Sequence, residues 1–335
     1  MSQKRFKLGI DMSDKYCVFH VQGGLGKHIA STAVARCIKN NYPDRKLIVV
    51  CVYTEVYMNL GFVDRVYPLN NTSYFYQNYI EDKDSYIFAN EPYYTTNHIN
   101  KKLPLIQSWC KMYGLNYNGE MPSLKFNTLQ KKISKEVWKT SKGNKPMMVI
   151  HTNGGLIHPN AKEYMWARDM PYSITQQIVD KYHKDFTIYQ CTKAQSEKCV
   201  NANIIDYGFE EESIRLSIME FLSIILHSDV RVLIDSSLQH AAAALNLPSL
   251  VLWNGTSPKV FGYDMHTNIE TIKPHDFKLP GSYLFDFDFN GVESEYPYDD
   301  DEEIFDIDKI FEYIDNQYNS LGPPRTKKKK RLKAS

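Results

Sequence analysis

The sequence has no long apolar run and few cysteines. None of its hydrophobic segments approaches the roughly 20 residues that a membrane-spanning helix needs, and residues 1–14 lack the apolar centre of a signal peptide. The six cysteines, at positions 17, 37, 51, 110, 191 and 199, form no CxxC pair and no spacing typical of a metal site. We therefore expect a soluble, cytoplasmic protein with reduced and buried thiols.

Several common catalytic motifs are also missing. The chain has no GxxxxGK[ST] phosphate loop, no HExxH zinc motif and no GxSxG nucleophile elbow. The DxD pattern occurs at 286–288 and 306–308, near an acidic stretch that suits the start of a helix. We predict no metal and no bound cofactor.

The formal net charge of +1 hides a strongly uneven distribution. Seven positive charges lie between Arg325 and Lys333, which leaves a net charge of −6 on the rest of the chain. This basic stretch follows Gly322, Pro323 and Pro324, so residues 321–335 are predicted to be a disordered tail. Either the tail binds DNA, RNA or an anionic membrane surface, or it is a solvated run of charge.

The chain is long enough for two domains of about 150 residues each. Apolar, β-branched strand patterns alternate with helical patterns, which predicts parallel α/β sheets with helices on both faces. In the first half we expect strands at 16–21, 46–53, 62–69 and 85–90, and helices at 27–40, 99–113 and 128–140.

A polar segment at 139–145 is the expected linker, after which the alternation begins again. Strands are expected at 146–151, 185–191, 230–234 and 249–253, with helices at 173–183, 214–226 and 236–247. The fold class is therefore α/β with two Rossmann-like domains, at 1–142 and 143–300. A closing helix at 301–320, centred on the apolar pattern of 304–318, completes the prediction.

The richest segment for function runs from Leu233 to Gly262. A buried strand ends at Asp235, Ser236 is placed to cap the next helix, and a second strand leads into Gly255, Thr256 and Ser257. Glycine lets a ligand approach the backbone, and hydroxyls and amides donate to phosphate oxygens. This layout predicts a nucleotide site at the end of a parallel sheet.

The same segment resembles the C-terminal half of the family 9 glycosyltransferases, the ADP-heptose:lipopolysaccharide heptosyltransferase family. The matching residues are Asp235, Ser236, Leu238, His240, Pro248, Gly255, Thr256, Ser257 and Pro258, while Ser237 replaces the family's glycine. The resemblance implies the GT-B arrangement, with two domains facing across a cleft and a C-terminal helix that often crosses back onto the first. It also implies metal-independent, inverting transfer of a sugar from a nucleotide diphosphate to a hydroxyl of a glycan or lipopolysaccharide-type acceptor.

The expected acceptor side is the loop that contains Gly23, Gly24 and Gly26. In the family, a Gly-Asp pair here supplies the carboxylate that deprotonates the acceptor, but Gly26 is followed by Lys27. His28 is then the nearest group that could accept the proton, and Lys27 could instead contact a phosphate or an anionic acceptor. Asp11 and Asp14 are the alternative bases, or His28 is a packing residue.

The expected donor side has a cation that faces the leaving diphosphate. Arg168 is the best match to the family's basic residue and Lys162 is second, although Arg168 could also pair with a carboxylate such as Asp169. Asp235 is assigned to the catalytic set, to orient the loop or the sugar hydroxyls, and His240 either reaches the site or is a core histidine. The remaining predicted donor residues are Asn153, Gly154, Thr192 (with Lys193 and Glu197 nearby), Ser236, Gly255, Thr256, Ser257 and Lys259.

Three alternatives stay open. The basic tail would suit a transferase that modifies nucleic acid bases. Lys27 in place of the family aspartate would suit a non-catalytic nucleotide-sugar-binding protein. A two-domain α/β epimerase would have a similar sheet pattern.

Overall fold

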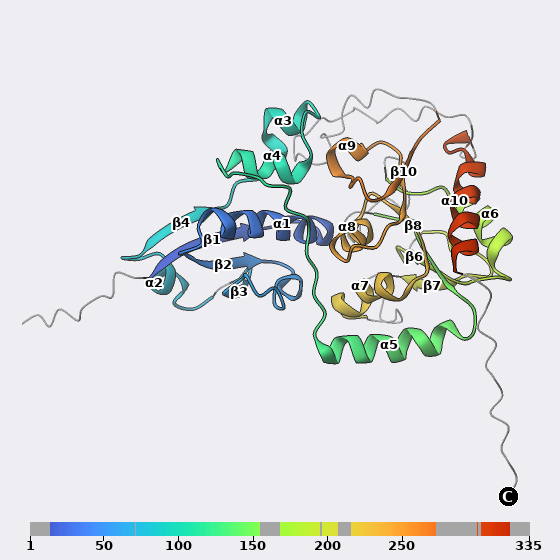
Figure 1. The fold of residues 1–335 in the computed structure, drawn as a ribbon, viewed down its shortest axis with the longest axis horizontal. Helices are drawn as coiled ribbons and strands as arrows, with labels where there is room; N and C mark the ends of the chain where they lie inside the picture. The colour runs from blue at the N-terminus through green and yellow to red at the C-terminus, as the bar shows by residue number, and fades with distance from the viewer. Residues whose placement is uncertain are drawn as a thin grey trace, which may run out of the picture.

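The computed structural model describes residues 14–70, 72–154, 168–194, 196–206, 216–272, 300 and 303–321. They form two parallel β-sheets with packed helices, which lie side by side (Figure 1). The predicted α/β class with two sheets is therefore confirmed. In the described part of the chain no helix is both long and apolar enough to cross a membrane. All six cysteines are free and buried, as predicted.

The first sheet has the strand order β3-β2-β1-β4. Its strands are β1 (Lys15–Val21), β2 (Lys46–Cys51), β3 (Arg65–Pro68) and β4 (Asp84–Phe88). Side chains of β1 alternate between two cores because successive residues of a strand point to opposite faces: Cys17 and Phe19 face α1 (Leu25–Asn41), whereas Tyr16 and Val18 face the short α2 (Phe75–Tyr79).

Short helical segments follow the first sheet. They are η1 (Thr54–Val56), η2 (Pro92–Tyr94), α3 (Thr96–Ile99) and α4 (Leu105–Met112). The single helix predicted at 99–113 is thus wrong in its start, because α4 begins only after Pro104. Proline restricts the preceding residue and lacks an amide donor, so it tends to open a helix and not to continue one.

The second sheet has the order β10-β9-β8-β5-β6-β7. Its strands are β5 (Met147–His151), β6 (Thr187–Thr192), β7 (Asn203–Asp206), β8 (Val230–Ile234), β9 (Leu250–Trp253) and β10 (Thr267–Glu270). The helices α7 (Ile218–His227) and α8 (Ser237–Ala244) cover one face, and α6 (Tyr172–Tyr182) and α10 (Ile307–Ser320) pack on the other. The short α9 (Pro258–Phe261) follows β9.

The helix α5 (Thr128–Lys142) precedes the predicted boundary at residue 142, yet it packs on the second sheet, against α7. The indole Nε1 of Trp138 donates to Ser223 at 2.8 Å, and Ser134 lies 3.0 Å from His227. The linker expected at 139–145 is therefore wrong, since α5 continues to Lys142. The chain crosses between the sheets earlier, at residues 114–127, as Figure 1 shows.

The closing helix α10 is confirmed as a helix but not in the place that the resemblance implies. It packs on the second sheet: Ile310 and Ile314 belong to the core around Met148. The hydroxyl of Tyr182 in α6 also donates to Asp315 at 2.7 Å. An apolar stripe buried against β8 and α6 keeps α10 away from the first sheet.

The two sheets share one apolar core because α1 packs directly on α8. Gly26 makes this approach possible: a Cβ atom there would lie 2.9 Å from His240 Cδ2 and 3.3 Å from the backbone of Ser237. Helix α1 begins just beyond the carboxyl end of β1, and α8 begins just beyond that of β8. The contact therefore sets the carboxyl ends of both sheets against each other.

Candidate functional site

The second sheet changes direction between β5 and β8. Numbered within this sheet, its strand order is 6-5-4-1-2-3, the doubly wound order in which ligands bind beyond the carboxyl ends of the two central strands. The loops after β5 and β8 meet at this point: a Cβ atom on Gly154 would lie 3.5 Å from the Asp235 carbonyl oxygen and from Ser236 Oγ. Gly154, Asp235 and Ser236, all predicted donor-side residues, are thus brought together.

Arg168 lies next to Asp235. Its Nη2 atom is 3.8 Å from Asp235 Oδ2, and the Arg168 side chain keeps about a fifth of its surface exposed while Asp235 is buried. Burial raises the pKa of the Asp235 carboxyl, and Arg168, Thr256 and Gln239 oppose this by lowering it. The neighbouring Asp169, considered above as a partner of Arg168, points elsewhere.

Buried polar atoms without a hydrogen-bond partner gather around this carboxyl. Among the described residues they include Asp235 Oδ2, Gln239 Oε1 and Thr256 Oγ1. Leaving such groups unsatisfied costs about 1–3 kcal/mol each, so a bound ligand or water is expected to satisfy them. Ser236 precedes α8, but its side chain makes no cap hydrogen bond, which corrects the predicted capping role.

Asp169 is a residue whose position the sequence analysis missed. It is fully buried, and its carboxylate accepts from the Gly154 amide at 2.9 Å and lies 3.3 Å from Lys193 Nζ. Its carbonyl oxygen accepts from Asn254 at 2.7 Å. Asp169 thus ties together the loops after β5, β6 and β9, and the only sequence signal was its place beside Arg168.

Other predicted donor residues make contacts within the protein. Thr192 and Asn153 are buried and hydrogen-bonded to each other. His240 Nδ1 lies 2.7 Å from the hydroxyl of Tyr263, and burial lowers the pKa of His240 to about 3. This geometry favours the core role of His240.

The turn after β9 is divided between buried and exposed groups. Gly255 and Thr256 are buried at the site, whereas Ser257 caps α9 by accepting from the Lys259 amide at 3.3 Å. Lys259 is exposed. The hydroxyl of Thr256 is therefore the side chain of this turn that lies beside the Asp235 carboxyl.

In the loop predicted to face the acceptor, Gly23 and Gly24 lead into α1. Gly23 has φ +95°, a left-handed conformation that favours glycine, and a Cβ atom there would lie 3.2 Å from Lys27 Cδ. His28 is fully buried: Nδ1 lies 3.0 Å from the Gly24 carbonyl and Nε2 accepts from the Val52 amide at 3.2 Å. Burial lowers the pKa of His28 to about 4. Both ring nitrogens are engaged, so the geometry favours the packing role of His28.

Lys27 is held inside the first domain. Its ammonium pairs with Glu91 and lies 5.2 Å from the ring centroid of Tyr93 and 5.5 Å from that of Trp109. Burial lowers the pKa of Lys27, and Glu91 opposes the shift. Lys27 is thus paired with the carboxylate of Glu91, a residue that the sequence analysis missed.

Asp14, one of the two alternative bases, does not reach this loop. Asp14 precedes β1 and pairs with Lys46, so the whole seven-residue strand separates it from the glycine loop. At about 3.3 Å per residue, this distance is roughly 20 Å. Asp11 lies outside the described residues, as do Lys162 and the basic stretch Arg325–Lys333.

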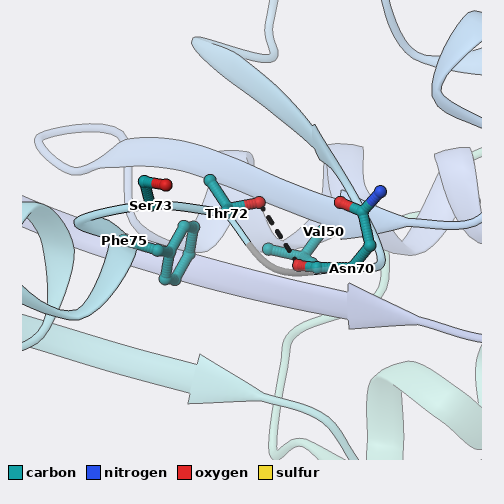
Figure 2. Close-up of a pocket in the computed structure, with 5 residues that line it drawn as sticks. All are labelled: Val50, Asn70, Thr72, Ser73 and Phe75. Carbon is teal, nitrogen blue, oxygen red and sulfur yellow. Dashed lines mark hydrogen bonds between the residues drawn. The ribbon is translucent and has the colours of Figure 1, made fainter.

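A small surface pocket lies apart from this site, on the first sheet. Figure 2 shows its lining, Val50, Asn70, Thr72, Ser73 and Phe75, around a cavity of about 300 Å³. Thr72 Oγ1 donates to the Asn70 carbonyl at 3.5 Å. The lining holds no ionisable side chain, so it offers no acid–base chemistry.

The described residues contain no group of three or more histidine, cysteine, aspartate or glutamate side chains that could hold a metal ion. The prediction that the protein needs no metal stays a prediction.

Neither a protein-family model nor a curated protein matches the sequence. Several solved structures are similar to this chain in their fold. A family 9 glycosyl transferase from Veillonella parvula aligns with a TM-score of 0.62 at 10% identity, covering 91% of this chain and 98% of its own. The ADP-heptose lipopolysaccharide heptosyltransferase II of Escherichia coli aligns with a TM-score of 0.60 at 12% identity, covering 91% and 99%.

A third similar structure is TibC of enterotoxigenic E. coli, a dodecameric iron-containing heptosyltransferase. Its complex with ADP-D-β-D-heptose aligns with a TM-score of 0.62 at 12% identity, covering 92% of this chain and 78% of its own. At such identities the likeness shows the fold. The chain has the two-domain GT-B fold of these glycosyltransferases, as the sequence resemblance implied.

Proposed function

We propose that the protein is a glycosyltransferase that moves a sugar from a nucleotide diphosphate donor to an acceptor hydroxyl. The observation that carries the proposal is the cluster of unpartnered buried atoms on Asp235, Gln239 and Thr256, beside Arg168, at the point where the second sheet changes direction. The GT-B fold of the similar structures supports the same reading.

The residues of this cluster have separate roles. Arg168 neutralises the charge that grows on the diphosphate as it leaves, because a fixed cation stabilises developing negative charge. The amides at the start of α8, which no side chain caps, bind phosphate oxygens. Asp235 and Thr256 bind hydroxyl groups of the donor. Asp169 and Lys193 position the loop at Gly154.

The finer parts of the proposal follow the similar proteins. E. coli heptosyltransferase II is described as acting from ADP-heptose on lipopolysaccharide, and TibC binds ADP-D-β-D-heptose. We therefore propose a nucleotide diphosphate sugar donor, a glycan or lipopolysaccharide-type acceptor and inversion at the anomeric carbon. Because Arg168 and the α8 amides provide the charge for the leaving group, no metal is needed, and the rate is expected to be unchanged by EDTA.

A thermal-shift screen tests donor binding. ADP-heptose, ADP-glucose, GDP-mannose, UDP-glucose and UDP-N-acetylglucosamine are compared, because a ligand that binds only the folded state raises its stability. At least one is expected to raise the melting temperature. Arg168→Ala should weaken its binding about 10- to 100-fold, the value of a charge-assisted hydrogen bond of about 1.5–3 kcal/mol. Arg65→Ala, an exposed arginine on β3, is the matched control.

Release of free nucleotide diphosphate separates an enzyme from a non-catalytic binder. A protein that binds a donor but never transfers or hydrolyses it would contradict the proposed activity. No binding of any donor in the panel would contradict the donor site itself.

A further inference from the structure

The first sheet has its own change of direction, between β1 and β4. The order β3-β2-β1-β4 places these two strands side by side, with β2 and β3 on one side of β1 and the edge strand β4 on the other. In doubly wound sheets a ligand binds beyond the carboxyl ends of such a strand pair. The loop after β1 contains Gly23 and Gly24, and the loop after β4 contains Glu91.

These two loops are joined by the Lys27–Glu91 ion pair. The Glu91 side chain keeps 28% of its surface exposed, whereas that of Lys27 keeps 9%. The pair uses Glu91 Oε2, and no hydrogen bond of Oε1 is found within the described residues. Glu91 therefore presents a carboxylate oxygen at the mouth of the loop, with its charge fixed by a lysine beneath it.

The backbone around Glu91 is fixed on both sides. The hydroxyl of Tyr113 donates to the Asn90 carbonyl at 2.7 Å, and Pro92 begins η2. Tyr93 then packs edge-on against His98, which packs against Phe261 of α9 on the donor side. The segment that carries Glu91 thus contacts the second domain next to the proposed donor site.

His28 and the other two carboxylates described at the facing ends of the two sheets are engaged or buried within the protein. Both nitrogens of His28 are hydrogen-bonded to the backbone, and Asp169 is buried against Lys193. Asp235 is buried beside Arg168 on the donor side. Of the described carboxylates at the facing ends of the two sheets, Glu91 combines exposure with an oxygen free to accept a proton.

From this juxtaposition we infer that Glu91 is the catalytic base of the proposed transfer and replaces, from the loop after β4, the carboxylate that Lys27 displaces from α1. Glu91 Oε1 accepts the proton of the acceptor hydroxyl as its oxygen bonds to the anomeric carbon of the donor. The bond from that carbon to the diphosphate oxygen breaks, and the electron pair leaves with the nucleotide diphosphate. Lys27 holds the carboxylate in place throughout.

Hydrolysis of the donor tests this inference without a known acceptor, because water can take the place of the acceptor hydroxyl. Release of nucleotide diphosphate is measured for the five donors named above. Glu91→Gln should lower kcat about 10²- to 10⁴-fold, the usual contribution of a general base, with the donor-induced melting shift unchanged. Glu81→Gln, an exposed glutamate in the same domain, should hydrolyse the donor at the wild-type rate.

A second variant separates a base from a positioning residue. Added formate should raise the hydrolysis rate of Glu91→Ala at least tenfold, since a small carboxylate can occupy the space left by the side chain and accept the proton. Glu91→Asp keeps a carboxylate at this position, so it can be used if the Gln and Ala variants fail to fold.

The outcomes distinguish this inference from the proposed function on which it rests. Wild-type protein that neither binds nor hydrolyses a donor would overturn the proposed function. Wild-type hydrolysis with Glu91→Gln within threefold of it would overturn only the role of Glu91. A loss of rate in Glu91→Ala that formate does not restore would also overturn the base role, because it would show that the side chain acts by position alone.

Discussion

Gly26 and His240 touch across the two domains: a methyl group on Gly26 would lie 2.9 Å from the imidazole Cδ2 atom. The same methyl group would lie 3.3 Å from the backbone of Ser237, which cannot move without shifting α8. Position 26 therefore has no room for a larger side chain than that of glycine.

Gly26→Ala is expected to destabilise the protein by about 1–3 kcal/mol, the usual cost of overpacking a core, despite the better helix propensity of alanine. Urea denaturation measures the change. Gly61→Ala is the control, since no atom lies within 4 Å of a Cβ atom there, and it should stay within about 0.5 kcal/mol of wild type. Equal stability of the two variants would contradict the tight packing of α1 on α8.

Asp235→Asn should stabilise the ligand-free protein as the pH rises while it weakens donor binding. The folded protein holds the Asp235 pKa above the value of 3.8 in the unfolded chain, so between the two values the folded state binds more protons than the unfolded state. The free energy of unfolding of the wild type therefore falls as pH rises through this window and stays lower above it. Asparagine does not ionise, and the variant avoids this loss.

Denaturation from pH 4.5 to 8 measures this difference. Asp264→Asn, at an exposed aspartate, is the control and should follow the wild-type curve. If Asp235→Asn also follows it, the carboxylate is not strained in the folded protein.

His98→Phe should make stability less sensitive to acid. Burial between Tyr93 and Phe261 lowers the pKa of His98 from 6.5 to about 4. Between these two pH values His98 is protonated in the unfolded chain but neutral in the folded protein. The resulting stability is complete above pH 6.5 and is lost as pH falls toward 4, by about 2 kcal/mol at pH 5. Phenylalanine keeps the ring packing and removes the titration.

Urea midpoints at pH 7.5 and pH 5 check the effect. The fall in the free energy of unfolding from pH 7.5 to pH 5 should be smaller in the variant than in the wild type by about 2 kcal/mol. An unchanged drop would mean that His98 is protonated in the folded protein.

Ser223→Ala should destabilise the protein by about 1–3 kcal/mol, because it leaves the buried indole N–H of Trp138 without its acceptor. Adding Trp138→Phe should cost less in this background than in the wild type, since the orphaned donor is then removed. Ser320→Ala, at an exposed serine, should change little. Additive costs would show that the bond does not hold α5 on the second sheet.

Central elements were predictable from sequence because their patterns are strong. Buried runs such as Met147–His151 and Val230–Ile234 are apolar throughout, as strands covered on both faces must be. The edge strands β7 and β10 were missed, since NIID and TNIE are short and half polar. Helix α5 was found, but its own pattern could not show that its apolar face meets α7 of the other sheet.

The proposed donor site was easier to predict, because Asp235, Ser236 and Thr256 lie in one continuous segment that runs from the end of β8 to the turn after β9. Asp169 and Glu91 were missed for a shared reason. Each acts through a partner distant in sequence, Gly154 and Lys193 for Asp169 and Lys27 for Glu91, and only the strand order brings these pairs together.

The packing of α1 on α8 fixes how the two domains are placed relative to each other before any ligand binds. Both helices start at the loops that hold the reacting groups, and they meet through alanines, leucine and glycine inside one shared core. The relative placement of donor and acceptor loops is then settled once, when the chain folds, and the loss of translational and rotational freedom does not recur in the protein at each turnover. If the protein transfers a sugar as proposed, little of the free energy of donor binding would be needed to bring the two domains together, and more of it could stabilise the leaving diphosphate.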